Sequence, residues 1–161
     1  MPAPSMTEVI SLDRLQVTYH SPDSREPKIA VDDLTLGVRQ GEVFGFLGPN
    51  GAGKTSTMNV LLGFAHASAG RARIFDVDVR LPIVCQRIGY LPELTCYYKF
   101  LTAEELLRAY ARIFDLSASE TNARIDELLA LVDLTPARKR QISTDSKGMQ
   151  QRLGLAQALL I

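Results

Sequence analysis

The sequence has 161 residues, of which 46% are apolar and 22% charged, a composition typical of a soluble globular domain with its own core. Eighteen basic and eighteen acidic residues cancel to a net charge of zero, which gives no electrostatic case for nucleic acid as a partner. No apolar run is long enough for a membrane span, and the first residues lack the basic-then-apolar form of a secretory signal, so we expect a cytoplasmic protein.

Two strands are predicted before any helix. Apolar and polar residues alternate from Val9 to Tyr19 and again from Ile29 to Val38, as they do in strands with one buried face. The connection 21–28 is polar and contains proline, which indicates a surface loop. Because no helix separates the two strands, we expect them to form an antiparallel layer.

A glycine-rich turn follows, between a predicted strand and a predicted helix. We expect the strand in the apolar run 43–47 and the helix at 56–62. The residues between them satisfy the phosphate-loop pattern GxxxxGK(S/T), in the strand–turn–helix context that the pattern requires. These residues are Gly48, Pro49, Asn50, Gly51, Ala52, Gly53, Lys54 and Thr55.

The spacing of this loop suits a polyphosphate. Glycines allow the backbone to curl round an anion so that successive N–H groups point inward, while the following helix offers its positive end. Lys54 is placed to reach the terminal phosphates, and the Thr55 hydroxyl is placed to ligate Mg²⁺. An ordinary glycine-rich turn is the alternative, but every required position is filled. We therefore predict a site for a magnesium nucleotide.

Further along the chain, short strands give way to helices. We expect strands at 71–75 and 87–91. Thr102 and Ser117 are each followed three residues later by glutamate, which predicts two capping boxes that open amphipathic helices. Thr135 and the proline after it predict a third, short helix.

The last predicted element is a capped helix with a distinctive sequence. Ser146 is expected to be the N-cap of a helix at 147–161. The stretch 146–159, SKGMQQRLGLAQAL, resembles the signature and signature helix of the ATP-binding subunit of ABC transporters, and residues 87–93 resemble the approach to that family's Q-loop. Together with the phosphate loop, the resemblance covers nearly the whole chain.

This resemblance implies a fold and a function. The fold is a partial phosphate-loop NTPase core of the α/β class with an antiparallel β-layer and a helical subdomain, divided into residues 1–92 and 93–161. The function is binding of ATP with Mg²⁺, and hydrolysis in the complete domain, to energise a transmembrane permease from the inner face of the cell membrane. The Leu-Pro-Glu and Ser-Lys-Gly-Met variants are similar to those of bacterial exporter-type subunits.

The resemblance also implies roles for individual residues. Tyr19 stacks on the adenine, and the chain from Asn50 to Ser56 holds the phosphates. Ser146 and Gly148 grip the terminal phosphate of ATP held by a second copy, so that two chains enclose two nucleotides head to tail. The alternatives are that Tyr19 only packs at a strand end and that the signature segment is an ordinary capped amphipathic helix.

Several positions depart from the family pattern. The Q-loop has glutamine where this chain has Glu93, whose carboxylate either serves as a ligand of Mg²⁺ or stays a solvated loop charge. The signature is DSKGM where the family consensus is LSGGQ. Lys147 therefore adds a cation beside the phosphate site, and Met149 removes an amide.

The family's Walker B strand, catalytic glutamate, D-loop and switch histidine all follow the signature helix, and none of them occurs before Ile161. We therefore expect a truncated chain that binds nucleotide with little or no turnover by itself. Contact with the permease is expected near 93–101, where Tyr97, Tyr98 and Phe100 either face a partner or pack on the helical insert. Two other functions stay open: a nucleotide-binding module without catalysis, and a soluble ABC ATPase that acts on ribosomes or DNA.

Overall fold

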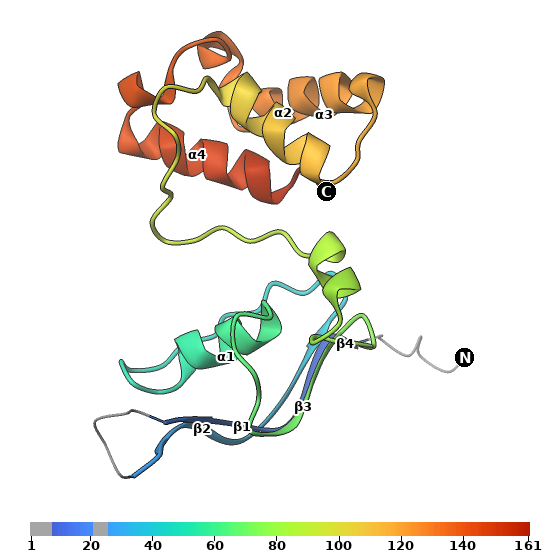
Figure 1. Cartoon of the computed structure of the whole chain (residues 1–161), viewed down its shortest axis with the longest axis vertical. Coiled ribbons are helices and arrows are strands. Elements are labelled where there is room, and N and C mark those ends of the chain that lie inside the picture. Colours follow the sequence, from blue (N-terminus) through green and yellow to red (C-terminus); the bar gives the residue numbers. More distant parts are fainter. Residues whose placement is uncertain (1–7, 21–25) are drawn as a thin grey trace. The chain divides into compact units, whose positions relative to one another are not determined.

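The computed structural model, which describes residues 8–20 and 26–161, separates the chain into a β-rich unit and a helical unit (Figure 1). The β-rich unit is Met1–Cys85 and the helical unit is Gln86–Ile161. Sheet and helices together give the predicted α/β fold. In the described part of the chain, no helix has both the length and the apolar character needed to cross a membrane.

The β-rich unit is built on a four-stranded antiparallel sheet with the strand order β2-β1-β3-β4 (Figure 1). The strands are β1 (Glu8–Tyr19), β2 (Lys28–Arg39), β3 (Ala69–Ile74) and β4 (Val77–Asp78). The predictions of an antiparallel first pair and of a strand near 71–75 are therefore confirmed. The expected loop at 21–28 lies mostly outside the described residues.

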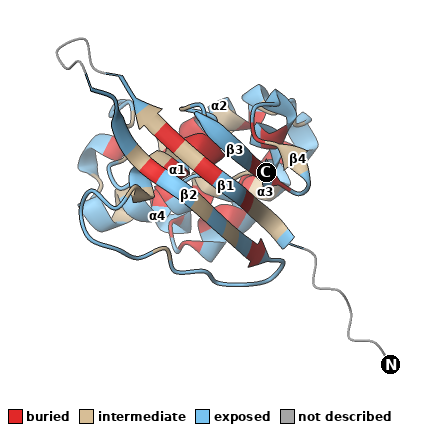
Figure 2. Cartoon of the chain, turned by 90° about the horizontal axis from the view of Figure 1, so that it is seen from below, coloured by how far each residue is buried: buried red, intermediate tan, exposed pale blue. Residues whose placement is uncertain are grey.

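The core of this unit lies between the sheet and helix α1 (Lys54–Leu61). Strand β1 supplies the buried side chains of Leu12, Leu15 and Val17, and β2 supplies Val31 and Val38 (Figure 2). From the helix, the buried residues are Thr57, Val60 and Leu61. Because α1 follows the phosphate loop directly, packing of this helix on the sheet fixes where the loop lies.

Two predicted strands are wrong. Residues 42–49 form no strand, and the side chains of Val43 and Leu47 are 100% and 91% exposed. Residues 88–91 have no regular structure either, and a 3₁₀ helix, Pro82–Arg87, precedes them. A strand requires a neighbour to satisfy its backbone hydrogen bonds, and among the described residues none pairs with these two segments.

The helical unit packs three helices around one apolar core. The helices are α2 (Ala103–Ile113), α3 (Ala118–Leu131) and α4 (Lys147–Ala158), with 3₁₀ turns at Thr135–Ala137 and Ile142–Thr144. Each fully buried aliphatic side chain contributes roughly 1.5–3 kcal/mol of stability by leaving water. The largest of them are Leu107, Ile125, Leu128, Leu129, Leu134, Ile142, Leu153 and Leu160.

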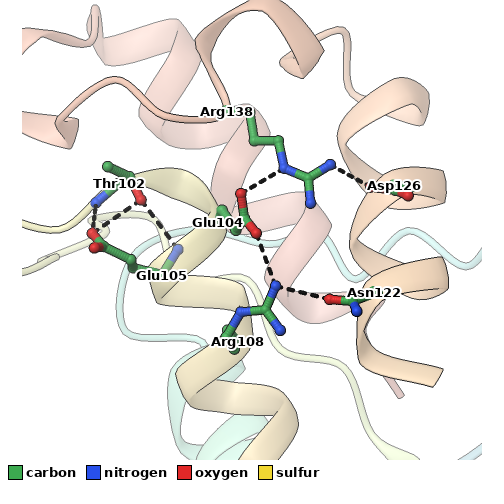
Figure 3. Close-up of polar contacts among 7 residues, drawn as sticks. All are labelled: Thr102, Glu104, Glu105, Arg108, Asn122, Asp126 and Arg138. Carbon is green, nitrogen blue, oxygen red and sulfur yellow. Dashed lines mark hydrogen bonds and ion pairs between the residues drawn. The ribbon is translucent and has the colours of Figure 1, made fainter. Parts of the chain in front are cut away.

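Both predicted capping boxes are present. The Thr102 hydroxyl accepts from the Glu105 N–H at 3.2 Å, and the Glu105 carboxylate accepts from the Thr102 N–H at 2.8 Å (Figure 3). Ser117 and Glu120 exchange the same two bonds, at 3.3 and 2.9 Å. The caps satisfy N–H groups that a helix leaves unpaired at its start, so they fix where α2 and α3 begin.

Charged side chains join α2 to α3 and to the 3₁₀ turn after it. Glu104 accepts from Arg138 at 2.6 Å and from Arg108 at 2.8 Å (Figure 3). Arg138 also pairs with Asp126, and Arg108 donates to Asn122 at 2.8 Å (Figure 3). These bonds hold the pKa of the Glu104 carboxyl at about 2, chiefly through Arg138 and then Arg108.

Candidate functional site

The last two residues of the phosphate loop, Lys54 and Thr55, already belong to α1, whose N-cap is Gly53. Gly53 is the N-cap residue with φ 85°, no side chain caps the helix, and no acidic residue occupies its first turn. A Cβ atom at this position would lie 2.4 Å from the carbonyl oxygen of Ala30, so only glycine fits between the loop and β2. The positive end of α1 is therefore open to an anion.

Lys54 folds back over the loop. Its Nζ donates to the carbonyl oxygens of Gly48 at 2.6 Å and Pro49 at 2.7 Å. The loop is closed further by a hydrogen bond of 3.3 Å from the Ala52 N–H to the Pro49 carbonyl. The ammonium group is thus held at the first residues of the loop by two carbonyl oxygens.

A hollow of about 250 Å³ lies against this loop. It is lined by Tyr19, at the end of β1, and by residues of the phosphate loop. Tyr19 is 42% exposed, so its ring remains available to a ligand. The lining residues are Tyr19, Lys28, Ala30, Asn50, Gly51, Gly53, Lys54, Thr55 and Ser56.

Sequence reasoning missed Lys28 and Ala30. Lys28 pairs with Tyr19 across the β1–β2 hairpin, and it is the second lysine among the residues that line the hollow. Only the register of that hairpin could have identified it, because the two residues share no local motif.

The other predicted site residues belong to the helical unit. Ser146 is the N-cap of α4, and its hydroxyl accepts from the Met149 N–H at 3.3 Å, which confirms the predicted cap. Gly148 is exposed in the first turn, where no acidic residue is present. The helix ends at Ala158, three residues before the expected end.

Glu93 is exposed in a segment without regular structure. Over the described residues, no group of three or more His, Cys, Asp or Glu side chains could hold a metal ion. The neighbouring aromatic residues differ in burial. Tyr98 and Phe100 are 70% and 68% exposed, whereas Tyr97 is partly buried and its hydroxyl donates to the Gln157 side chain at 3.2 Å. Burial, and to a lesser degree Tyr110, raises the pKa of Tyr97 to about 12.

The residues around the hollow fit a magnesium nucleotide. Two lysines and the uncapped start of α1 suit a polyphosphate, and the exposed aromatic ring of Tyr19 suits a base. Mg²⁺ keeps several waters and takes other ligands from phosphates, and among the residues that line the hollow the Thr55 hydroxyl is placed after the phosphate loop to supply one protein ligand.

The chain is similar to a known protein family and to many individual proteins, of which three are described. Residues 31–161 match the family model described as ABC transporter. An uncharacterized ABC transporter ATP-binding protein of Synechocystis is 45% identical, over 79% of this chain and 36% of that protein. The bacitracin transport ATP-binding protein BcrA of Bacillus licheniformis is 39% identical, over 96% of this chain and 48% of that protein.

A solved structure of an ATP-binding subunit of an ABC transporter matches with a TM-score of 0.81 at 27% identity, over 94% of this chain and 62% of that one. This chain accordingly spans between 36% and 62% of the length of the three proteins. On these matches, the chain belongs to the family of ABC transporter ATP-binding proteins.

Proposed function

We propose that this chain binds ATP with Mg²⁺ in the hollow between Tyr19 and the phosphate loop, as the ATP-binding part of an ABC transporter. The observation that carries the proposal is the convergence, in one hollow, of Tyr19, Lys54 and the uncapped start of α1. The transport name of the BcrA relative supports the link to a permease.

Each lining residue has a separate task in this proposal. The N–H groups of the loop and of the first turn of α1 bind the phosphates, and Lys54 leaves its carbonyl partners to neutralise the terminal ones. Lys28 adds charge from β2. Thr55 supplies one ligand to Mg²⁺, which when bound neutralises phosphate charge, and Tyr19 stacks on the adenine.

The helical unit supplies the second half of the site. Ser146 and Gly148, at the exposed start of α4, bind the terminal phosphate of ATP held by a second copy of this chain, and no acidic residue lies in the first turn to oppose it. Glu93 faces water or Mg²⁺. In the full assembly a transmembrane permease holds the pair of chains at the inner face of the membrane.

We further propose that these 161 residues bind ATP with little turnover when tested alone. Phosphoryl transfer to water needs a residue that orients the attacking water. Of the described residues that line the hollow, none is Asp, Glu or His. Release of inorganic phosphate by the purified chain at the usual rate of an ATPase would contradict this part.

Calorimetric titration with ATP and Mg²⁺ tests the binding proposal. We expect saturable binding to the wild type and at least about tenfold weaker binding to Lys54→Ala, because the variant loses charge-assisted contacts. Lys139→Ala is the matched control, since Lys139 is exposed in the helical unit and should not change the affinity. Equal affinities for the wild type and Lys54→Ala, or no binding by the wild type, would overturn the proposal.

A further inference from the structure

A buried carboxylate lies directly before the N-cap of α4. The side chain of Asp145 is 2% exposed, although the residue belongs to a short connection between the 3₁₀ turn Ile142–Thr144 and α4. Its backbone is fixed on both sides: the Asp145 N–H donates to Ile142 at 3.1 Å, and its carbonyl oxygen accepts from Gln150 at 3.2 Å. The backbone of Asp145 is therefore held in place, and its carboxylate lies away from water.

Arg140 is the cation that meets this carboxylate. Its Nε and Nη2 atoms donate to the same Asp145 oxygen, at 3.2 and 2.8 Å, and Nη2 also lies 3.0 Å from the Met149 sulfur. One guanidinium thus connects the residue before the N-cap to the third residue of the helix. The Arg140 side chain is 48% exposed, whereas that of Asp145 is 2% exposed.

The position of this pair matters for any anion at the start of α4. A carboxylate at this end of the helix is attracted by the helix dipole, and so is a phosphate. If Asp145 were left unpaired, its charge would repel a phosphate that approaches Ser146 and Gly148. Arg140 removes that repulsion and at the same time holds the turn that presents both residues.

We propose that Arg140 is a positioning residue for phosphate binding at the start of α4, and that its task is to neutralise the buried carboxylate of Asp145. The inference rests on the proposed function, in which Ser146 and Gly148 bind ATP held by a second copy. It adds a requirement specific to this chain, because the family consensus has an apolar leucine at the position of Asp145 and needs no such partner.

The test is a titration of the ¹⁵N-labelled 161-residue chain with ATP and Mg²⁺, followed by the amide signals of Gly53 and Gly148. Gly53 reports on the phosphate loop, and Gly148 reports on the start of α4. In the wild type both signals should shift, and the Gly148 shift should grow with protein concentration, because its phosphate comes from a second copy.

The Arg140→Ala variant should keep the Gly53 shift, whereas the ATP affinity reported by Gly148 should fall about tenfold, since a like charge now faces the phosphate. The double variant Arg140→Ala/Asp145→Leu should recover wild-type affinity within about twofold, because the charge that needed a partner is gone. Arg112→Ala, which removes an exposed arginine from the last turn of α2, is the matched control and should behave as the wild type.

The outcomes separate the two proposals. Absence of a Gly53 shift in the wild type would overturn the proposed function itself. A Gly53 shift without a Gly148 shift would reject phosphate binding at the start of α4, and the inference with it, while nucleotide binding in the hollow would stand. If the double variant stayed as weak as Arg140→Ala, Arg140 would be a direct ligand of the phosphate or a general support of the turn, and neutralisation of Asp145 would be rejected.

Discussion

At the scale of single residues, paired charges determine how the helical unit responds to pH. Glu104 is 20% exposed and receives two arginines, and its pKa is about 2 in place of the ordinary 4.5. A carboxyl whose pKa is lower in the folded than in the unfolded protein adds stability above its unfolded pKa. That contribution is lost as pH falls from 4.5 towards 2.

Replacing Glu104 by glutamine should lower the free energy of unfolding at pH 7 by about 1–2 kcal/mol, a value reduced by partial solvent screening. The difference from the wild type should shrink as pH falls below 4.5, because Glu104 of the unfolded wild-type chain then becomes protonated. Urea denaturation followed by circular dichroism at several pH values measures it. Glu127→Gln, at a carboxylate that is 63% exposed, is the control and should change little. A loss for Glu104→Gln that did not depend on pH would refute the assignment.

The phosphate loop could be predicted residue by residue because its chemistry is local. Gly53 must adopt a positive φ beside Ala30, and Lys54 and Thr55 follow it directly in the chain. Lys28 could not be predicted in the same way. It reaches the hollow only because the hairpin register places it opposite Tyr19, and sequence patterns do not specify register at that distance.

At the scale of elements, a glycine in α4 allows another segment to pack closely. Gly154 is buried, and a Cβ atom there would lie 2.6 Å from a methyl carbon of Leu91, 2.9 Å from the Tyr97 hydroxyl and 3.0 Å from a methyl carbon of Thr95. The segment 91–97, which contains Glu93, is therefore seated on the signature helix within the helical unit.

Alanine substitutions at two glycines of α4 should distinguish the effect of close packing on stability from the effect of helix propensity. Both Gly154→Ala and Gly148→Ala gain up to about 1 kcal/mol of helix propensity. Only Gly154→Ala forces neighbouring side chains to move, at a cost of about 1–3 kcal/mol. The nearest atom to a Cβ at Gly148 is the Ser146 hydroxyl, 4.0 Å away. Thermal unfolding should therefore occur at a lower temperature in Gly154→Ala than in Gly148→Ala, and the reverse order would show that segment 91–97 is not seated there.

Elements differed in how well the sequence predicted them, and the difference has a physical cause. The starts of α2, α3 and α4 were predicted because Thr102, Ser117 and Ser146 satisfy N–H groups only a few residues away. The strands expected at 43–47 and 87–91 were wrong because an apolar run indicates only that a segment can pair. Whether it does depends on a neighbouring strand, which local sequence does not reveal.

At the scale of the whole molecule, the β-rich unit carries Tyr19 and the phosphate loop, and the helical unit carries Ser146, Gly148 and Glu93. The division at Cys85 falls in the 3₁₀ helix after β4, before the Q-loop-like segment. The proposed nucleotide site lies in the β-rich unit alone, in one hollow lined by the ring of Tyr19 and by the loop. A measurement that can detect nucleotide at any position of the chain tests whether it binds in this hollow.

Photoaffinity labelling with 8-azido-ATP, followed by peptide mapping of the whole chain, is that measurement. Because the azide is carried by the adenine, we predict that the label falls on the peptide that contains Tyr19. An excess of ATP should prevent the labelling, and so should the Lys54→Ala substitution, since the base is held there only while the phosphates are bound. Labelling that concentrated on any peptide outside the hollow, or that persisted unchanged in excess ATP, would contradict the account.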